Sequence, residues 1–204
     1  TGTGSRYLLE TGSRRLLVDC GLFQGYKQLR LRNWATPPIE AASIDAVILT
    51  HAHIDHSGYL PRLAVEGFRG PIYCSSGTME LCRMLLPDSG RLHEEDARFA
   101  NRHGFSKHHP ALPLYTQDDA EAVLRQFKPV KAHTTFTPVP GVDAELRYAG
   151  HILGATFVRV LAEGVSVTFS GDIGRPHDPV MNAAEAPAAT DYLVTESTYG
   201  DRTH

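Results

Sequence analysis

Short apolar runs and amphipathic segments alternate along this chain, with glycine, proline or polar turns between them. Residues 7–10 and 15–19, joined by a Thr-Gly-Ser turn, predict a β-hairpin. The apolar run 44–49 predicts a strand, residues 59–66 predict a helix ended by Gly67, and residues 71–74 predict a further strand. Such an alternation of strands and helices is typical of a layered α/β domain.

The middle of the chain has a helical pattern, and the second half has a β pattern. Residues 78–86, 91–102 and 118–127 predict three helices. Proline and glycine then punctuate a series of strands, among them residues 144–148 and 165–169, and residues 191–195 predict a last strand. Residues 183–189 are rich in alanine and proline, which indicates a linker.

Composition fits an enzyme domain with one sizeable core. The chain has 204 residues, of which 42% are hydrophobic and 21% are charged, and its length suggests one or two domains. A net charge of −3 gives no basic signature for nucleic-acid binding, although bound metal ions would add positive charge that this count omits. The three cysteines form no C-x-x-C pair, which indicates reduced, buried thiols. No apolar run is long enough to span a membrane, and we expect a cytoplasmic protein without membrane contact.

Four metal-binding side chains stand within six residues directly after the apolar run 46–50. They are His51, His53, Asp55 and His56. Such a cluster would waste desolvation if it were buried without a partner, so a shared metal ion explains it best. One tetrahedral ion would be crowded by four ligands from so short a loop, which favours two adjacent ions. The alternative is a histidine-rich surface loop that binds metal only adventitiously.

Two later segments offer further ligands. His151 follows residues 144–148, Asp172 follows residues 165–169, and each segment has a glycine beside the polar residue. Glycine permits tight turns and close approach of the backbone, which suits a ligand at the rim of a sheet. A lone histidine or aspartate at a strand end is more often a capped turn, but their joint occurrence with the first cluster favours a common site.

The pattern H-x-H-x-D-H formed by residues 51–56 resembles the signature of the metallo-β-lactamase superfamily. The resemblance implies an αββα sandwich over residues 1–204, in which the first strand and a C-terminal part are expected to be missing. It also implies two Zn²⁺ ions, with Asp172 bridging them and Asp19 supporting the ligand loop from behind. His51, His53 and His151 would hold one zinc ion, and Asp55 and His56 would hold the other.

The long interval between His56 and His151 indicates a subfamily, because its helical stretches 88–97 and 101–109 resemble those of the β-CASP nucleases. Several basic side chains here could form a surface for a phosphate backbone. The alternative is an ordinary solvated helix face balanced by three acids at positions 94–96. The candidate nucleic-acid contacts are Arg91, Arg98, Arg102, Lys107, His108 and His109.

Residues 191–202 are similar to β-CASP motif A, with Glu196 at the acidic position of Glu-Ser-Thr-Tyr-Gly. In that family this carboxylate orients a histidine from a later motif, which protonates the leaving oxygen. The resemblance therefore places the β-CASP domain, the general-acid histidine and a further zinc-ligating histidine after residue 204. With that ligand missing, we expect the second zinc site to be incomplete and weaker than the site of His51, His53 and His151. His204 matches no residue with a known role.

These features predict a zinc-dependent phosphodiesterase that cleaves RNA or single-stranded DNA, with Asp55 and Glu196 as catalytic residues. A thioester or lactone hydrolase would share the zinc ligands but would not need Glu196. A non-catalytic scaffold of an RNA-processing complex is the third hypothesis, and the intact ligand set argues against it. A diiron redox protein is disfavoured because His53 is intact. The sequence leaves two kinds of protein partner open. One is a second copy of the chain, in a homodimer, and the other is a subunit of a processing complex.

Overall fold

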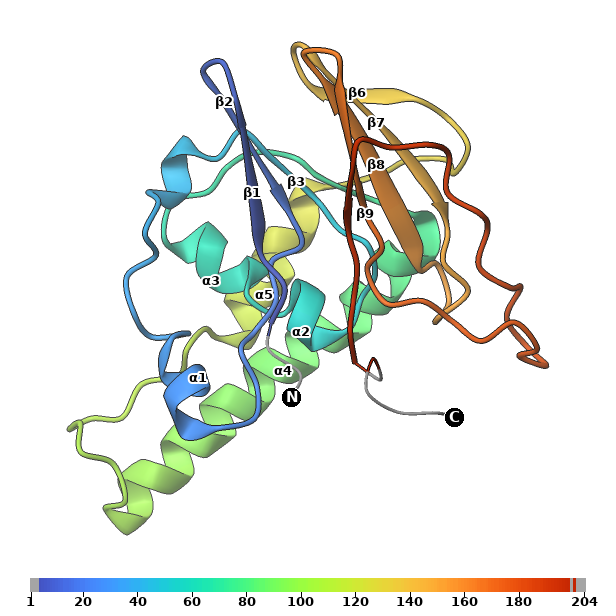
Figure 1. The fold of residues 1–204 in the computed structure, drawn as a ribbon. Coiled ribbons are helices and arrows are strands. Elements are labelled where there is room, and N and C mark those ends of the chain that lie inside the picture. The colour runs from blue at the N-terminus through green and yellow to red at the C-terminus, as the bar shows by residue number, and fades with distance from the viewer. Residues whose placement is uncertain (1–3, 199, 201–204) are drawn as a thin grey trace.

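Two five-stranded β-sheets face each other and carry the structure, a computed structural model that describes residues 4–198 and 200 (Figure 1). In the first sheet β1 is antiparallel to β2, whereas β2, β3, β4 and β5 are parallel, as expected where helices connect the strands. The strands, in spatial order, are β1 (Tyr7–Thr11), β2 (Arg14–Val18), β3 (Ala46–Ile48), β4 (Ile72–Cys74) and β5 (Phe127–Pro129).

The second sheet is mainly antiparallel, and only its edge strand β10 runs parallel to its neighbour β9. Strands β7 and β9 flank β8 and are antiparallel to it, so they point in the same direction as each other and as β10. In spatial order the strands are β10 (Tyr192–Val194), β9 (Val165–Phe169), β8 (Thr156–Ala162), β7 (Val142–Tyr148) and β6 (Phe136–Val139).

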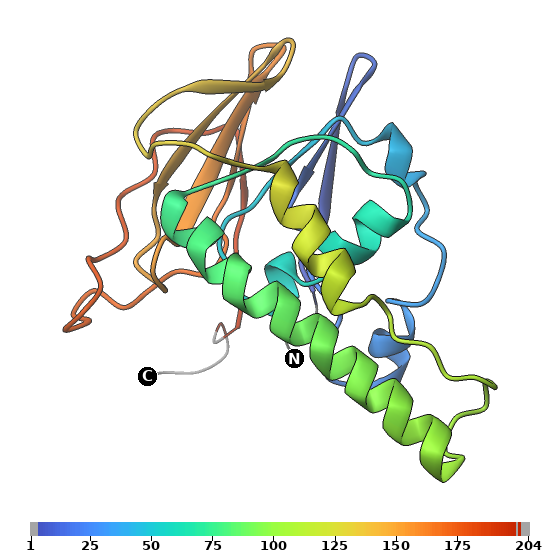
Figure 2. The same ribbon diagram turned by 180° about the vertical axis from the view of Figure 1, so that it is seen from behind.

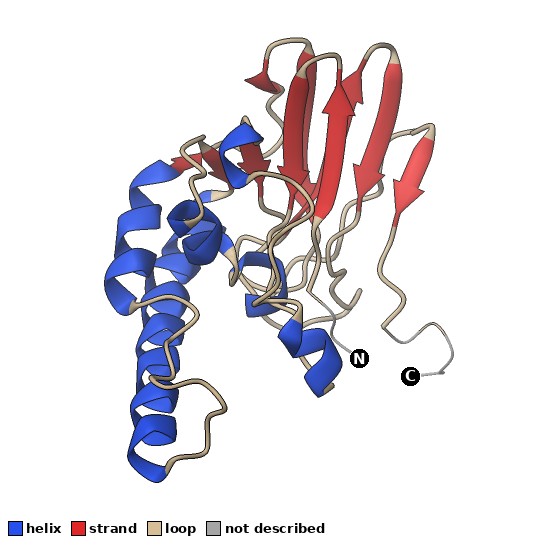
Figure 3. Ribbon diagram, turned by 90° about the vertical axis from the view of Figure 1, so that its left-hand side faces the viewer, coloured by secondary structure: helices blue, strands red, loops and turns tan. Residues whose placement is uncertain are grey.

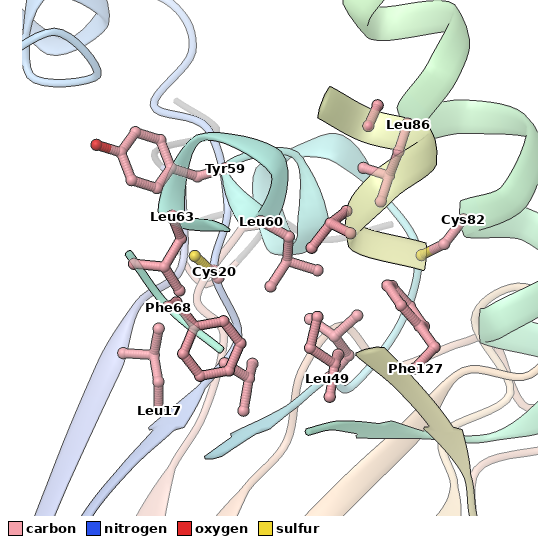
Figure 4. Close-up of a cluster of buried hydrophobic side chains, with 14 of the residues drawn as sticks. Leu17, Cys20, Leu49, Tyr59, Leu60, Leu63, Phe68, Cys82, Leu86 and Phe127 are labelled. Atoms are coloured by element: carbon pink, nitrogen blue, oxygen red, sulfur yellow. The ribbon is translucent and has the colours of Figure 1, made fainter. Parts of the chain in front are cut away.

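The two sheets enclose one apolar core between them. Leu16, Val18 and Ile48 of the first sheet meet Leu146 and Val158 of the second, and all five are almost fully buried. A second core lies on the other face of the first sheet, where side chains of β2 and β3 meet three helices (Figures 2 and 4). Because β3 lies between both cores, its three residues are all buried, which explains why its sequence is uniformly apolar.

The covering helices are α3 (Leu60–Val65), α4 (Ser76–His103) and α5 (Gln117–Val123). Among the described residues, helices cover the first sheet and not the outer face of the second (Figure 3). The predicted class, an α/β sandwich of the αββα type, is confirmed, with three of its four layers in the described part of the chain.

The two helices predicted over residues 78–86 and 91–102 form the single helix α4, so the predicted break is wrong. Pro87 lies inside this helix, and tertiary packing overrides its helix-breaking tendency. Gly90 is buried where α4 crosses the segment before α5, since an added Cβ would lie 2.6 Å from the Thr116 carbonyl oxygen. Close packing at Gly90 thus holds the helix continuous past the proline.

One local prediction is wrong, and some short elements were not predicted. Phe127 begins β5 instead of ending a helix, because α5 stops at Val123 and a 3₁₀ turn, η2 (Leu124–Gln126), follows it. Three short elements were not predicted, being too short for a periodic pattern to develop: α1 (Lys27–Leu31), η1 (Ala41–Ser43) and α2 (Ile54–Ser57). Residues 183–189 have no regular structure, as predicted for a linker.

The three cysteines are free and buried, as the sequence indicated. Burial raises the pKa of the Cys20 and Cys82 thiols to about 12 and raises that of Cys74 as well. Within the described residues, none of the helices has the length and apolar character needed to cross a membrane.

Candidate metal centre

The predicted ligands gather at one edge of the sandwich, because each follows the carboxyl end of a strand. Asp19 follows β2 and His51 follows β3 in the first sheet. His151 follows β7, Asp172 follows β9, and Glu196 follows β10 in the second sheet. Since these strands point the same way within each sheet, residues from distant parts of the sequence meet at the lower edge in Figure 1.

Four of the predicted ligands form a compact group of donor atoms. One ligand atom from each of His51, His53, His151 and Asp172 lies within 4.8 Å of the other three. His53 Nδ1 is 3.1 Å from His51 Nε2 and 3.2 Å from His151 Nε2. Asp172 Oδ2 completes the group at 3.7 Å from His51 Nε2 and 3.6 Å from His151 Nε2.

His56 begins a second group of donors beside the first. Its Nε2 atom lies 3.2 Å from Asp172 Oδ1 and 3.9 Å from Asp55 Oδ2. Asp172 therefore turns one carboxylate oxygen toward His51 and His151 and the other toward His56. His56 Nδ1 faces away from these groups and lies 2.8 Å from Asp19 Oδ2.

Asp19 and Thr50 fix two of the histidine rings from behind. Asp19 Oδ1 accepts a hydrogen bond from the Thr50 backbone N–H at 2.8 Å, and the Thr50 hydroxyl lies 2.9 Å from Asp19 Oδ2. The same hydroxyl lies 3.0 Å from His51 Nδ1. If Thr50 Oγ1 donates to Asp19 and accepts from His51 Nδ1–H, the lone pair of His51 Nε2 is left facing the donor group.

The structure thus shows the contacts through which Asp19 supports the ligand loop. Thr50 takes part in these contacts and was not predicted from the sequence. Asp19 adopts a positive φ of 58°, a conformation tolerated by aspartate better than by most residues, and this turns its carboxylate toward Thr50 and His56. A threonine at a strand end has no distinctive pattern, so only the structure reveals its contact with His51.

The electrostatics of the cluster favour a cation. Burial, followed by the neighbouring His56, lowers the pKa of His51 to about 2, and burial also lowers the pKa of His53, so both rings are neutral. Burial acts against the charged form of His56, but its contacts with Asp172 and Asp19 outweigh burial and raise its pKa to about 10. Burial acts against the charge of Asp172 too, yet the contact with His56 lowers the pKa of this carboxyl to about 2.

This donor set fits a metal ion. One proton cannot satisfy three imidazole nitrogens at once, and here His53 Nδ1 lies 3.1 and 3.2 Å from the Nε2 atoms of His51 and His151. Neutral imidazole nitrogens together with a carboxylate oxygen are ligands that Zn²⁺ accepts in tetrahedral sites. The pair of carboxylates that raises the pKa of His56 would equally attract a divalent cation, which competes with the proton for its Nε2 atom.

Close backbone contacts hold the ligand loops in place. An added Cβ on Gly21 would lie 1.6 Å from the Asp55 carbonyl oxygen, and one on Gly174 would lie 1.8 Å from the Gly150 carbonyl oxygen. The same carbonyl of Asp55 accepts a hydrogen bond from Ser5 N–H at 2.7 Å. The loops around Asp55 and His151 are therefore packed at distances that only glycine permits.

Glu196 shares a pocket with the second donor group. The pocket has a volume of about 430 Å³, and its lining includes Asp55, His56, Asp172 and Glu196. Glu196 Oε1 accepts a hydrogen bond from the Ile173 backbone N–H at 2.6 Å, directly beside Asp172. Its Oε2 accepts one from the Thr198 hydroxyl at 2.8 Å. The structure thus brings this predicted catalytic residue to the edge of the cluster.

The predicted nucleic-acid contacts are not brought to the cluster. Helix α4 begins beside the loop of His151, since Ser75 Oγ donates to the Gly154 carbonyl at 2.6 Å, and it runs away from there (Figure 1). Arg98 and Arg102 stand in its distal half, roughly 30–40 Å along the axis at 1.5 Å per residue. Arg91 is held by Asp88 and Glu95 at 2.7 and 2.6 Å. Lys107, His108 and His109 lie in the exposed loop after α4, and the role of all these residues stays a prediction.

Comparison with known proteins identifies the family of this chain. The family model described as metallo-beta-lactamase superfamily matches residues 2–198. A solved metallo-β-lactamase with the HARLDQ motif from Cronobacter sakazakii shares the fold, with a TM-score of 0.54, 22% identity, and coverage of 88% of this chain and 60% of that chain. This chain therefore belongs to the metallo-β-lactamase superfamily, whose members bind metal ions, and its cluster of histidine and aspartate fits such a site.

Two curated relatives indicate the branch. Ribonuclease TTHA0252 of Thermus thermophilus is 35% identical over 202 residues, which are 99% of this chain and 42% of that protein. Cleavage and polyadenylation specificity factor 73 of Drosophila melanogaster is 30% identical over 199 residues, which are 97% of this chain and 27% of that protein. The resemblance to the β-CASP nucleases is confirmed by these relatives. The chain spans less than half of their length.

Proposed function

We propose that this chain carries the centre of a zinc-dependent phosphodiesterase that cleaves RNA or single-stranded DNA. The observation that carries the proposal is the position of Asp172, whose two oxygens face different groups of histidines, at 3.6 and 3.7 Å on one side and 3.2 Å on the other. A carboxylate between two donor groups suits a pair of ions, and paired ions are a recurring feature of enzymes that hydrolyse phosphate esters. The name of the Thermus relative, a ribonuclease, favours RNA.

Each predicted ligand has a place in this proposal. His51, His53 and His151 would hold one Zn²⁺, Asp55 and His56 would hold the other, and Asp172 would bridge them. When bound, the two ions supply Lewis-acid polarisation of the phosphodiester and lower the pKa of a coordinated water. Asp55 lines the pocket and would accept a hydrogen bond from the attacking water.

Glu196 would act as a positioning residue. Its carboxylate is fixed by Ile173 N–H and the Thr198 hydroxyl, and one oxygen of a carboxylate can accept more than one hydrogen bond. The remaining lone pairs can hold the N–H of an imidazole whose other nitrogen protonates the leaving oxygen. The resemblance assigns that imidazole to a later motif of the family.

Partners and location follow from the same proposal. The name of the Drosophila relative, a polyadenylation factor, supports assembly of this protein with RNA-processing partners. The alternative is a homodimer of two copies of this chain. Three free, buried cysteines suit the reducing conditions of the cytoplasm, which we propose as the location.

The test is a substrate panel, with protein expressed from its complete coding sequence. Wild type and the variants Asp55→Ala and His56→Ala are assayed with zinc on RNA, single-stranded DNA and a thioester. We expect nucleic-acid cleavage that falls by about 10²-fold or more in both variants, because each change removes charge stabilisation at the reacting phosphate. Cleavage of the thioester alone would favour the hydrolase of another branch, and inertness toward all three would favour the scaffold.

A further variant separates the role of Glu196 from a structural role. Glu196→Gln should lower RNA cleavage and shift the alkaline limb of the pH profile, because a carboxamide holds an imidazolium less well than a carboxylate does. Glu80→Gln is the matched control, since Glu80 is exposed on α4 and its nearest cation, Arg83, is 3.8 Å away. An unchanged pH profile in Glu196→Gln would remove the positioning role.

A further inference from the structure

The distal end of α4 has exposed aromatic side chains that the metal centre does not use. We call Phe99, His103 and Phe105 the aromatic platform. Phe99 has an exposed fraction of 56% and Phe105 of 73%, which are high values for large apolar rings. Scattered exposed rings need no explanation, but three rings gathered on one surface indicate a binding site.

Local structure creates this platform. Gly104 ends α4 with a positive φ of 66°, and the Phe105 N–H then bonds to the Ala100 carbonyl at 3.2 Å. This turn reverses the chain and places Phe105 over the last turn of the helix. Ring centroids of Phe105 lie 5.8 Å from His103 and 5.9 Å from Phe99, and the rings of His103 and Phe105 are nearly parallel, at 19°.

The loop behind the platform is fixed to the helix. Asn101 Oδ1 accepts from Ala111 N–H at 2.7 Å, and Asn101 Nδ2 donates to the Ala111 carbonyl at 2.9 Å. These two bonds close the loop of residues 104–111 against α4. The rings are therefore held in a defined arrangement, which lowers the entropic cost of binding a flat ligand.

The segment that forms the platform carries basic side chains. Residues 97–117 contain Arg98, Arg102 and Lys107 but neither aspartate nor glutamate, although the whole chain has a net charge of −3. The acids of α4 precede this stretch, at positions 80, 88 and 94–96, and two more follow it at positions 118 and 119. No hydrogen bond or ion pair to an acid is formed by these three cations within the described residues. Flat, sequence-tolerant rings flanked by free cations match the bases and phosphates of a single strand.

From these observations we infer that the aromatic platform is a docking site for single-stranded RNA, separate from the metal centre. This inference rests on the proposed function, because it names how the same substrate is held. Bases would stack on Phe99, His103 and Phe105, and Arg98, Arg102 and Lys107 would contact the adjacent phosphates. Phe99 stands 23 positions after Ser76, about 35 Å along the helix, so only a strand long enough to span this distance contacts both sites.

The test measures RNA affinity apart from catalysis. Protein from the complete coding sequence, kept without divalent metal, is titrated with a long and a short single-stranded RNA. The double variant Phe99→Leu, Phe105→Leu should bind the long RNA more weakly, by about 5- to 150-fold for each base that loses its stacking partner, because leucine keeps apolar bulk but cannot stack on a base. The short RNA cannot span both sites. If it is bound at the platform, its affinity should fall by the same factor.

Charge variants test the phosphate contacts independently. Arg102→Gln and Lys107→Gln should each reduce the slope of log affinity against log salt by about 0.7, whereas the leucine variants should leave the slope unchanged. Met84→Ala is the matched control, because Met84 is exposed on α4 but lies in its proximal half, away from the platform. Equal RNA affinity in wild type, the leucine variants and the charge variants would overturn the inference.

Two further measurements separate this inference from the proposed function. Bis(p-nitrophenyl) phosphate is a phosphodiester without bases, and the leucine variants should hydrolyse it at the wild-type rate when zinc is present. If wild type does not hydrolyse it or RNA, the proposed function fails, while the RNA titrations still decide the platform. If the leucine variants change the oligomeric state and leave RNA affinity unchanged, the platform is a protein interface and the inference is wrong.

Discussion

Thr50 supplies the hydroxyl that connects Asp19 to His51, at 2.9 and 3.0 Å respectively. We predict that Thr50→Val weakens zinc binding by about 10- to 100-fold, because valine keeps the volume of threonine but leaves the His51 ring without the partner that sets its tautomer. Competition with a chromophoric chelator measures this affinity without any need for activity.

Thr50→Ser is the matched control for this change. Serine retains the hydroxyl, so zinc affinity should stay within a few fold of wild type. Equal affinity in Thr50→Val and wild type would show that the hydroxyl does not orient His51. A loss of thermal stability without a loss of zinc affinity would assign Thr50 a purely structural role.

At the residue scale the chemically distinctive side chains could be predicted from the sequence. His51, His53 and His56 stand so close together that few roles other than metal binding suit them. Thr50 could not be predicted, because its role depends on a turn of the Asp19 backbone to a φ of 58° that brings the carboxylate to its hydroxyl. The sequence carries no periodic signal for such a contact.

The loops at the ends of β2 and β3 are held by a contact that only glycine allows. We predict that Gly21→Ala lowers both the melting temperature and the zinc content, because the new methyl group would lie 1.6 Å from the Asp55 carbonyl oxygen. Overpacking of this kind typically costs about 1–3 kcal/mol. Calorimetry and metal analysis of the purified protein measure the two effects.

Gly200→Ala is the control at this scale, since its added Cβ would meet its nearest neighbour, the Ser197 carbonyl oxygen, at 3.4 Å, an ordinary contact. Its melting temperature should match that of wild type. If Gly21→Ala had the stability and zinc content of wild type, the prediction would be wrong. The loops of Asp19 and Asp55 would then be able to move apart and accommodate the methyl group.

Helix α4 continues through Pro87, which lacks a backbone N–H for the Arg83 carbonyl. We predict that Pro87→Ala raises the free energy of unfolding by about 1–3 kcal/mol, because alanine restores that hydrogen bond and removes the clash of the ring. Denaturant titration measures this change. Met84→Ala, an exposed control on the same helix, should change stability by less than about 0.5 kcal/mol.

A decrease in stability of Pro87→Ala would contradict this prediction and would mean that the proline ring contributes packing that alanine cannot replace.

The same helix shows how far secondary-structure elements can be predicted from the sequence. Strand β9 could be predicted to the residue, whereas two helices were predicted over 78–86 and 91–102 where the structure has one, packed at Gly90 against the Thr116 backbone. Helix propensity describes how each residue favours or disfavours a helix, but it does not describe the tertiary packing that keeps α4 continuous.

In the molecule as a whole, the candidate metal centre lies between the two sheets. His51 follows a strand of the first sheet, and His151 and Asp172 follow strands of the second, so an ion bound between them would link both halves of the sandwich. The resemblance predicted the layered class, which is confirmed, and a set of ligands, which stays a prediction. The sequence could not predict the outward course of α4, which depends on packing between helices far apart in sequence.

We predict that removing metal lowers the melting temperature, because ligand binding to the folded state stabilises it by about 2.7 kcal/mol at a free concentration 100 times Kd. For a chain of this length that corresponds to roughly 5–10 °C. Thermal scans with zinc and with chelator measure the shift. His151→Ala should give nearly the same melting temperature in both conditions, and a shift as large as that of wild type would contradict the assignment of His151 as a ligand.

If the proposed function holds, two ions held around Asp172 serve the cleavage of RNA. The most direct measurement is the rate of RNA cleavage by protein from the complete coding sequence, first freed of metal by dialysis against chelator and then titrated with Zn²⁺. We expect no cleavage without metal and a rate that rises until two ions are bound per chain, the first more tightly than the second. A full rate in the metal-free protein, or a rate that reaches its maximum with one bound ion, would contradict it.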